Sequence, residues 1–171
     1  TLFAINVTAS CQFKYEIPFP KPIECLNDTV SVLIIGDVMM HSRQLEYDHR
    51  PFLSSISKRM QEADFCLANM EFPLGGRPYT GYPVFSTPDW YAEYVAACGA
   101  DVFLMANNHV LDKGTTGLER TLKVYSEMSD SLGIRFTGAA LNAASSRESY
   151  PLIISRRGIR IALVNFTYGT N

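Results

Sequence analysis

The chain has 171 residues, of which 47% are hydrophobic and 19% are charged. This composition fits one folded domain with a substantial core and excludes an intrinsically disordered protein. The 15 basic and 17 acidic residues give a formal net charge of −2 without any basic run, so no nucleic acid is expected as a partner. All apolar runs are too short to predict a transmembrane helix.

Residues 1–29 are predicted to precede the folded domain, which then spans residues 30–171. The apolar opening ends at Thr8-Ala9-Ser10-Cys11, which is similar to the end of a bacterial lipoprotein signal. On that interpretation the protein is lipid-anchored at Cys11, in the cell envelope and outside the cytoplasm. An apolar edge strand is the alternative. Three prolines between residues 18 and 22 predict an extended linker, and a disulfide between Cys11 and Cys25 is left open.

From residue 30 onward, apolar runs alternate with segments of helical periodicity. A continuous β-branched and aliphatic run predicts a strand at residues 30–36, and short apolar segments predict strands at residues 64–68, 101–106 and 134–137. Apolar spacing and end signals predict helices over residues 51–63, 88–99 and from residue 115 or 116 to about 133. Thr87 is the expected cap of the second helix, after a long loop at residues 72–88.

A hairpin is predicted near the end of the chain, with residues 150–154 and 159–166 flanking Arg156-Arg157-Gly158. We expect the strands near residues 31–36, 64–68, 101–106 and 159–166 to lie in one twisted sheet. Strands that alternate with helices predict an α/β fold with a largely parallel sheet.

Polar side chains directly follow three of the predicted strands: Asp37, Glu71 and the run Asn107-Asn108-His109. Ligands of open α/β sheets bind beyond the carboxyl ends of the strands, so these side chains are expected to converge. Carboxylates, a side-chain carbonyl and an imidazole suit a divalent metal such as Mn²⁺, Mg²⁺, Fe or Zn²⁺. Such a metal could polarise a phosphoryl group, with His109 as a proton donor.

Each of these residues also has a structural explanation. Asp37 could cap the following helix, Glu71 could be a solvated loop residue, and Asn-Asn-His could form a turn. Asp112 could cap the next helix. His41 and His49 lie in a predicted loop, where histidines are more often incidental than ligands. The combination of elements is what indicates a site.

Three segments together resemble a known family: Gly36-Asp37-Val38-Met39, Ala68-Asn69-Met70-Glu71 and Ala106-Asn107-Asn108-His109-x-x-Asp112-x-Gly114. They look like the successive motifs of CapA-type proteins of poly-γ-glutamate capsule biosynthesis, which are related to calcineurin-like metallophosphoesterases. The resemblance runs from about Ser31 to Asn171.

The resemblance implies a layered α/β sandwich that is incomplete at the C-terminus, with a metal site at the strand ends. The implied metal ligands are Asp37, Glu71 and Asn108, and His109 is the implied catalytic residue that contacts a phosphoryl group. Weaker candidates for substrate binding are Asn107, Asp112 and His41. The implied substrate is an anionic polymer or a phosphoester, and membrane-bound capsule synthase components are implied partners.

Two departures from the family pattern bear on activity. The usual phosphoesterase motif is Asp-x-His, but Met39 stands where the histidine is expected, and a thioether is a poor ligand for a hard cation. The family supplies further histidines from His-Trp-Gly and His-Pro-His elements in its C-terminal part, and residues 1–171 contain neither element, so only part of a metal site is expected here. A non-catalytic envelope component that binds polyglutamate or a synthase partner is therefore the main alternative, and a module that binds a small anion is a third.

Overall fold

A computed structural model describes residues 3–7 and 29–171, and its central element is a five-stranded sheet in the order β1-β2-β3-β4-β5. The first strand pairs antiparallel with the second, and all other neighbouring pairs are parallel. The predicted α/β fold is confirmed. The strands are Phe3–Val7 (β1), Val30–Val38 (β2), Phe65–Met70 (β3), Val102–Leu104 (β4) and Arg135–Thr137 (β5).

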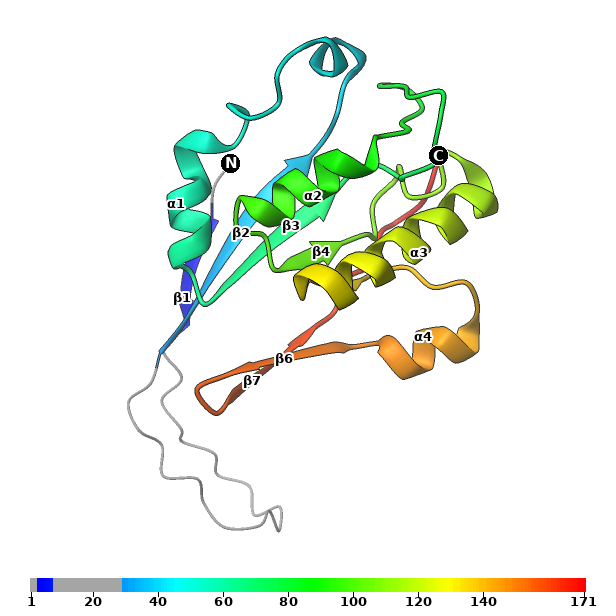
Figure 1. The fold of residues 1–171 in the computed structure, drawn as a ribbon. Helices are drawn as coiled ribbons and strands as arrows, with labels where there is room; N and C mark the ends of the chain where they lie inside the picture. The colour runs from blue at the N-terminus through cyan, green and yellow to red at the C-terminus, as the bar shows by residue number, and fades with distance from the viewer. Residues whose placement is uncertain (1–2, 8–28) are drawn as a thin grey trace.

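Three helices cover one face of this sheet, because each one connects two neighbouring parallel strands (Figure 1). They are α1 (Ser54–Glu62), α2 (Asp89–Ala97) and α3 (Gly114–Leu132), and a short 3-10 helix, η1 (Ser42–Glu46), precedes α1. In α3 the buried residues recur every three or four positions, which directs one stripe into the core. They are Leu118, Thr121, Tyr125 and Met128, and Gly117 is also buried beside Leu118.

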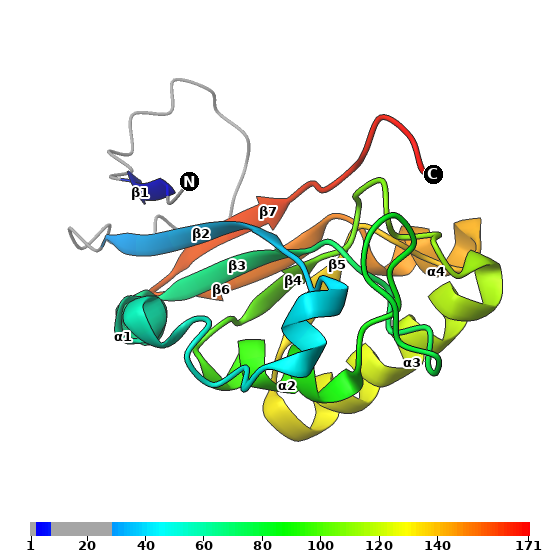
Figure 2. The ribbon, with the colours of Figure 1, turned by 90° about the horizontal axis from the view of Figure 1, so that it is seen from above.

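The other face of the sheet is covered by a separate two-stranded sheet (Figure 2). This hairpin consists of β6 (Leu152–Arg156) and β7 (Ile159–Leu163), and a short helix, α4 (Ala143–Ser149), leads into it. Leu152 and Ile154 pack with Leu67 and Val102 of the main sheet in a second buried cluster. Helices, sheet and hairpin therefore form a layered α/β sandwich.

Two expectations about these elements were wrong. The strand near residues 159–166 does not join the main sheet, because its apolar residues pack onto the face of that sheet and its backbone pairs, among the described residues, with β6 alone. Thr87 does not cap α2: Pro88 occupies the cap position, and the buried Thr87 hydroxyl has no hydrogen-bond partner among the described residues.

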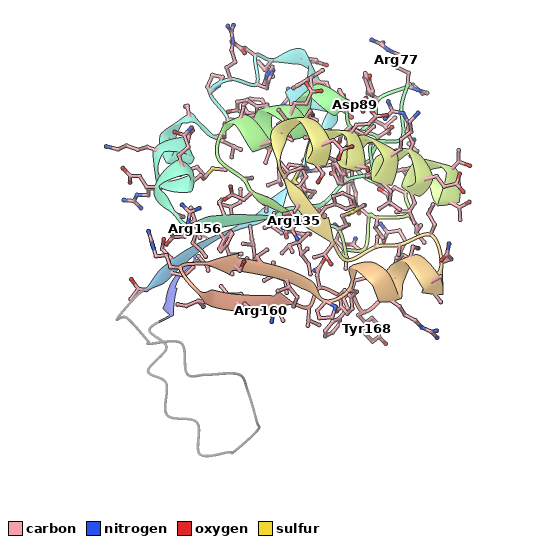
Figure 3. The ribbon with its side chains drawn as sticks, turned by 60° about the horizontal axis from the view of Figure 1, so that its bottom comes forward. Arg77, Asp89, Arg135, Arg156, Arg160 and Tyr168 are labelled. Carbon is pink, nitrogen blue, oxygen red and sulfur yellow. The ribbon has the colours of Figure 1, made fainter. Side chains whose placement is uncertain are left out.

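The turn of the hairpin is held against the start of β2 and β3 by Asp64. Its carboxylate accepts hydrogen bonds from the backbone and hydroxyl of Ser31, at 2.9 and 3.0 Å, and from Arg157 at 2.8 Å. Arg156 lies at the same end of the hairpin (Figure 3), 3.6 Å from Asp64. The backbone amide of Ser31, together with Arg157, lowers the pKa of Asp64 from its usual value, although burial opposes this.

Of the first 29 residues, the structure describes 3–7 and 29. Residues Phe3–Val7 form an edge strand, which is the alternative that the sequence left open for this segment. The proline-rich segment and both Cys11 and Cys25 lie outside the described residues. Within residues 3–7 and 29–171, no helix has the length and apolarity that a membrane crossing requires.

Candidate functional site

The site forms where β2, β3 and β4 end, on the side of the molecule where the C-terminus lies (Figure 1). An irregularity in β2 shapes its first part. Leu33, Ile35 and Val38 all belong to the helix-side core, so strict alternation is broken once, and the register shifts between Ile35 and Asp37. The shift places Val38 in the core and leaves Asp37 exposed beside Asn69. Asp37 therefore lies within a strand and does not cap a helix.

Asn69 brings two carboxylates together. Its Nδ2 donates to Asp37 Oδ1 at 2.8 Å and to Glu71 Oε2 at 3.2 Å. Glu71 is only 8% exposed, and its backbone amide donates to the Val38 carbonyl at 3.0 Å. Because both carboxylates accept from one amide nitrogen, Asp37 and Glu71 face the same small volume.

Burial raises the pKa of Glu71 from 4.5 to about 7. The neighbouring charge of Asp37 adds to the shift, as does a hydrogen bond between the two carboxyl groups, whereas His109 lowers it. Two carboxylates this close repel each other unless one holds a proton or a cation lies between them. The pair is therefore suited to binding a cation.

The loop after β4 is fixed to this carboxylate pair by Asn107. Its Nδ2 donates to Asn69 Oδ1 at 3.2 Å and to the Met70 carbonyl at 3.0 Å. Its Oδ1 accepts from the backbone amide of His109 at 3.1 Å. The side chain is buried, and its hydrogen bonds connect β3 to the loop that carries His109.

The imidazole of His109 is held between two acidic groups and is only 4% exposed. Its Nδ1 lies 2.7 Å from Asp112 Oδ2, and its Nε2 lies 4.0 Å from Glu71 Oε1. Asp112 also accepts from the backbone amide of Phe85 at 2.7 Å, and the Phe85 ring meets the imidazole edge-on at 4.7 Å between centroids. The Asp112 carboxylate can only accept a hydrogen bond, so the imidazole proton is placed on Nδ1, the nitrogen beside it. The other ring nitrogen, Nε2, faces Glu71. Asp112 does not cap α3, whose cap position is Lys113.

The last residue of the chain, Asn171, also contacts this loop. Its backbone amide donates to the Asn108 carbonyl at 2.9 Å, and its Nδ2 lies 3.0 Å from His109 Nδ1 and 3.3 Å from Asp112 Oδ1. Because Nδ1 carries a proton, the Asn171 amide proton goes to Asp112. The exposed Asn108 side chain donates to Asn171 Oδ1 at 3.5 Å and has no hydrogen bond to Asp37 or Glu71 among the described contacts.

The structure thus brings Asp37, Glu71 and His109 together, with Asn107 and Asp112 as their supports. Asn108 lies at the rim. The exposed His41 contacts the Phe85 ring, at 5.3 Å between centroids, and its backbone amide donates to Gln44 Oε1 at 2.7 Å. The sequence interpretation did not assign Asn69, although its place between a strand and Glu71 was a usable signal. Asn171 carried no such signal, because its contacts reach 62 residues back along the chain to His109.

The donor set suits a hard divalent cation but is small. Asp37 and Glu71 supply carboxylate oxygens, the ligands that Mg²⁺ and Mn²⁺ prefer. Met39 adds none, since its side chain packs against the core and its carbonyl accepts from the Tyr91 hydroxyl at 3.3 Å. Within the described ranges, no group of three or more His, Cys, Asp or Glu side chains is arranged to hold a metal ion. Any cation bound by these residues alone would keep open coordination positions.

Comparison with known proteins gives a consistent picture. The family model for "Bacterial capsule synthesis protein PGA_cap" matches residues 31–171. The protein y4sH of Sinorhizobium fredii, itself uncharacterized, is 30% identical over 146 residues, covering 81% of this chain and 30% of its own length. The capsule biosynthesis protein CapA of Bacillus anthracis is 23% identical over 151 residues, covering 82% of this chain and 35% of its own length. The chain thus spans about a third of the length of these curated relatives.

Proposed function

Because the chain belongs to the bacterial capsule synthesis protein family PGA_cap, we propose that it acts in capsule biosynthesis through a metal-dependent, phosphoesterase-like site. The observation that carries this proposal is the pair Asp37 and Glu71, joined by Asn69, beside the oriented imidazole of His109. The substrate would be an anionic capsule polymer such as poly-γ-glutamate or a phosphoester.

Asp37 and Glu71 are the residues that would hold the cation, and Asn108 at the rim could add an amide oxygen. A bound cation would supply electrostatic stabilisation to a phosphoryl group and would favour the ionised form of Glu71. Asn69 holds the two carboxylates in place, with its oxygen fixed in turn by Asn107. Hydrogen bonds within the protein thus hold the two carboxylates in position without a ligand.

When Nε2 also holds a proton, His109 would transfer that proton to the leaving group and return to the form protonated on Nδ1 alone. Asp112 fixes the ring by accepting from Nδ1, which leaves Nε2 directed to the carboxylate pair. Phe85 closes one side of the ring and limits the access of water. An imidazole that is buried, oriented and adjacent to a cation site is the arrangement that general acid–base catalysis needs.

The test compares variants of the purified protein for bound Mn²⁺ and for hydrolysis of a chromogenic phosphoester. His109→Ala should lower the turnover by about two to four orders of magnitude while the Mn²⁺ content stays unchanged. Asp37→Ala should lose the metal. His49→Ala is the matched control, since His49 packs between Trp90 and Tyr94. Hydrolysis by His109→Ala at the wild-type rate would refute the catalytic role.

A second candidate function is a non-catalytic envelope component that binds polyglutamate or a synthase partner. Met39 favours this candidate, because it replaces an expected ligand with a side chain that packs in the core. It predicts no hydrolysis by any variant and retained binding of an acidic polymer. The same set of variants therefore separates the two functions.

Location and partners belong to the same proposal. A lipid anchor at Cys11 would hold the protein at the cell envelope, beside the membrane-bound synthase components that make the capsule polymer. The test is mass spectrometry of the native N-terminus. An intact chain with an unmodified Cys11 would refute the anchor.

A further inference from the structure

A cavity of about 360 Å³ lies at the carboxyl end of β5, which is two strands from β3 and adjacent to β4, the strand that precedes the His109 loop. Its walls come from the loop after β5, from α4 and from the segment after β7. The lining residues are Thr137, Gly138, Ala139, Ala140, Asn142, Ala143, Ser146, Tyr150, Asn165 and Phe166.

This cavity shares a wall with the loop that carries His109. Asn165 Oδ1 accepts from the backbone amide of Ala106 at 2.8 Å, and Ala106 immediately precedes Asn107. Gly138 makes the close approach possible: its φ is +105°, and a Cβ there would collide with Asn165 Oδ1 and lie 2.7 Å from the Ala106 nitrogen. A ligand in the cavity would therefore lie next to the candidate site.

The cavity wall offers polar groups that have no partner within the protein. Thr137 is only 4% exposed, yet its hydroxyl has no hydrogen bond among the described residues. The Asn165 Nδ2 group and the hydroxyls of Ser146 and Tyr150 are also without partners in the described part of the chain. Thr137 is a buried residue, whereas Ser146, Tyr150 and Asn165 are half-buried, so these polar groups remain available to hydrogen-bond a ligand that enters the cavity.

The charge of the lining identifies the class of ligand. None of the lining residues is acidic or basic, and the exposed Arg147 of α4 is not among them. A carboxylate or a phosphate would enter this space without a counter-charge, which is costly. Tyr150 and Phe166 provide flat apolar surfaces beside the hydroxyl and amide groups. Apolar surfaces with a few placed polar groups suit a neutral ligand that carries hydroxyls and amides.

We infer that this cavity binds a neutral sugar ring, which forms the part of the substrate next to the reacting group. The role of the sugar as part of a substrate rests on the proposed function, whereas its binding to the cavity does not. The inference favours a sugar-linked phosphoester over poly-γ-glutamate, whose repeated carboxylates find no basic partner in this cavity.

The experiment is a titration of the ¹⁵N-labelled protein with N-acetylglucosamine, followed by NMR, with tri-γ-glutamate as the anionic comparator. The sugar should shift the amide resonances of residues 137–146 and of Asn165. Thr137→Val and Ser146→Ala should each weaken the affinity by about five- to tenfold, because each removes one hydrogen bond. The control Thr116→Val, an exposed threonine of α3, should leave the affinity unchanged.

Three results would overturn the inference: no shifts with the sugar, equal affinity in Thr137→Val and wild type, or tighter binding of tri-γ-glutamate at the same residues. Asp37→Asn separates this inference from the proposed function. That variant should lose the metal and still bind the sugar with the wild-type affinity. Loss of hydrolysis with retained sugar binding would therefore count against the carboxylate site alone.

Discussion

Replacing Glu71 by Gln should stabilise the metal-free protein at alkaline pH and leave its stability unchanged in acid. The introduced amide would mimic the protonated carboxyl group, so it would keep the hydrogen bond from Asn69 and would remove the repulsion by Asp37. The variant isolates the cost of ionising a buried carboxyl group that lies next to a second one.

The size of this effect follows from the pKa of Glu71, which burial and Asp37 raise from 4.5 to about 7. Below 4.5 the group is protonated in both the folded and the unfolded chain, so it contributes no difference. Between 4.5 and 7 the folded state binds more protons, and the free energy of unfolding therefore falls as the pH rises. Above 7 the cost is constant, at roughly 3 kcal/mol.

The assay is urea denaturation of wild type and Glu71→Gln in EDTA. The variant should be more stable by roughly 3 kcal/mol near pH 8, whereas the two proteins should be nearly equal near pH 4.5. Glu119→Gln, on the exposed face of α3, is the control and should change stability by less than about 0.5 kcal/mol. Equal stabilities of wild type and Glu71→Gln at both pH values would refute the strained carboxylate pair.

Three further predictions use the same urea denaturation. Asp64→Ala should cost about 1–2 kcal/mol, mainly through its lost hydrogen bonds from β2, and more than the exposed Asp48→Ala; equal losses would show that the hairpin turn is not held there. Gly138→Ala should cost at least about 2 kcal/mol, whereas Gly169→Ala, with nothing within 4 Å, should be neutral; a neutral Gly138→Ala would contradict the close packing. Tyr125→Phe should add about 1 kcal/mol, because the buried hydroxyl has no partner among the described residues; a loss of stability would indicate a bound water.

The sequence predicted the elements of the main sheet well, because a short run of β-branched and aliphatic residues that ends at Gly36-Asp37 is typical of a buried strand. Helical periodicity likewise located α1 and α3 to within a few residues. The hairpin was located correctly, but its sheet was not. Alternating apolar residues at Ile159, Ile161 and Leu163 predict a half-buried strand, and they do not specify whether the strand joins a sheet edge or lies on a sheet face.

Within the site, residues placed by the sequence next to them could be predicted, whereas contacts between distant segments could not. Asp37 and Glu71 directly follow apolar runs, so their place at the sheet edge could be predicted from the topology of parallel strands. The irregular register of β2 at Gly36 could not, since one inserted residue leaves no mark on the apolar pattern. The contacts of Asn171 with the His109 loop depend on how the segment after β7 returns across the molecule, which is a property of the whole fold.

The surroundings of Asp112 bear most directly on whether the site is catalytic or only binds a ligand. Its side chain is fully buried, and a buried carboxylate is costly unless several donors satisfy it. The Phe85 amide, the Asn171 amide and His109 Nδ1 supply those donors. An amide side chain could accept from the Phe85 backbone at a lower desolvation cost, so the turn alone does not require a charge. A carboxylate at position 112 differs from an amide mainly in its effect on the His109 imidazole. It fixes the Nδ1–H tautomer and stabilises the ring when Nε2 also holds a proton. Binding an acidic polymer would use only the positive charge of the doubly protonated ring, whereas proton transfer at Nε2 needs both properties.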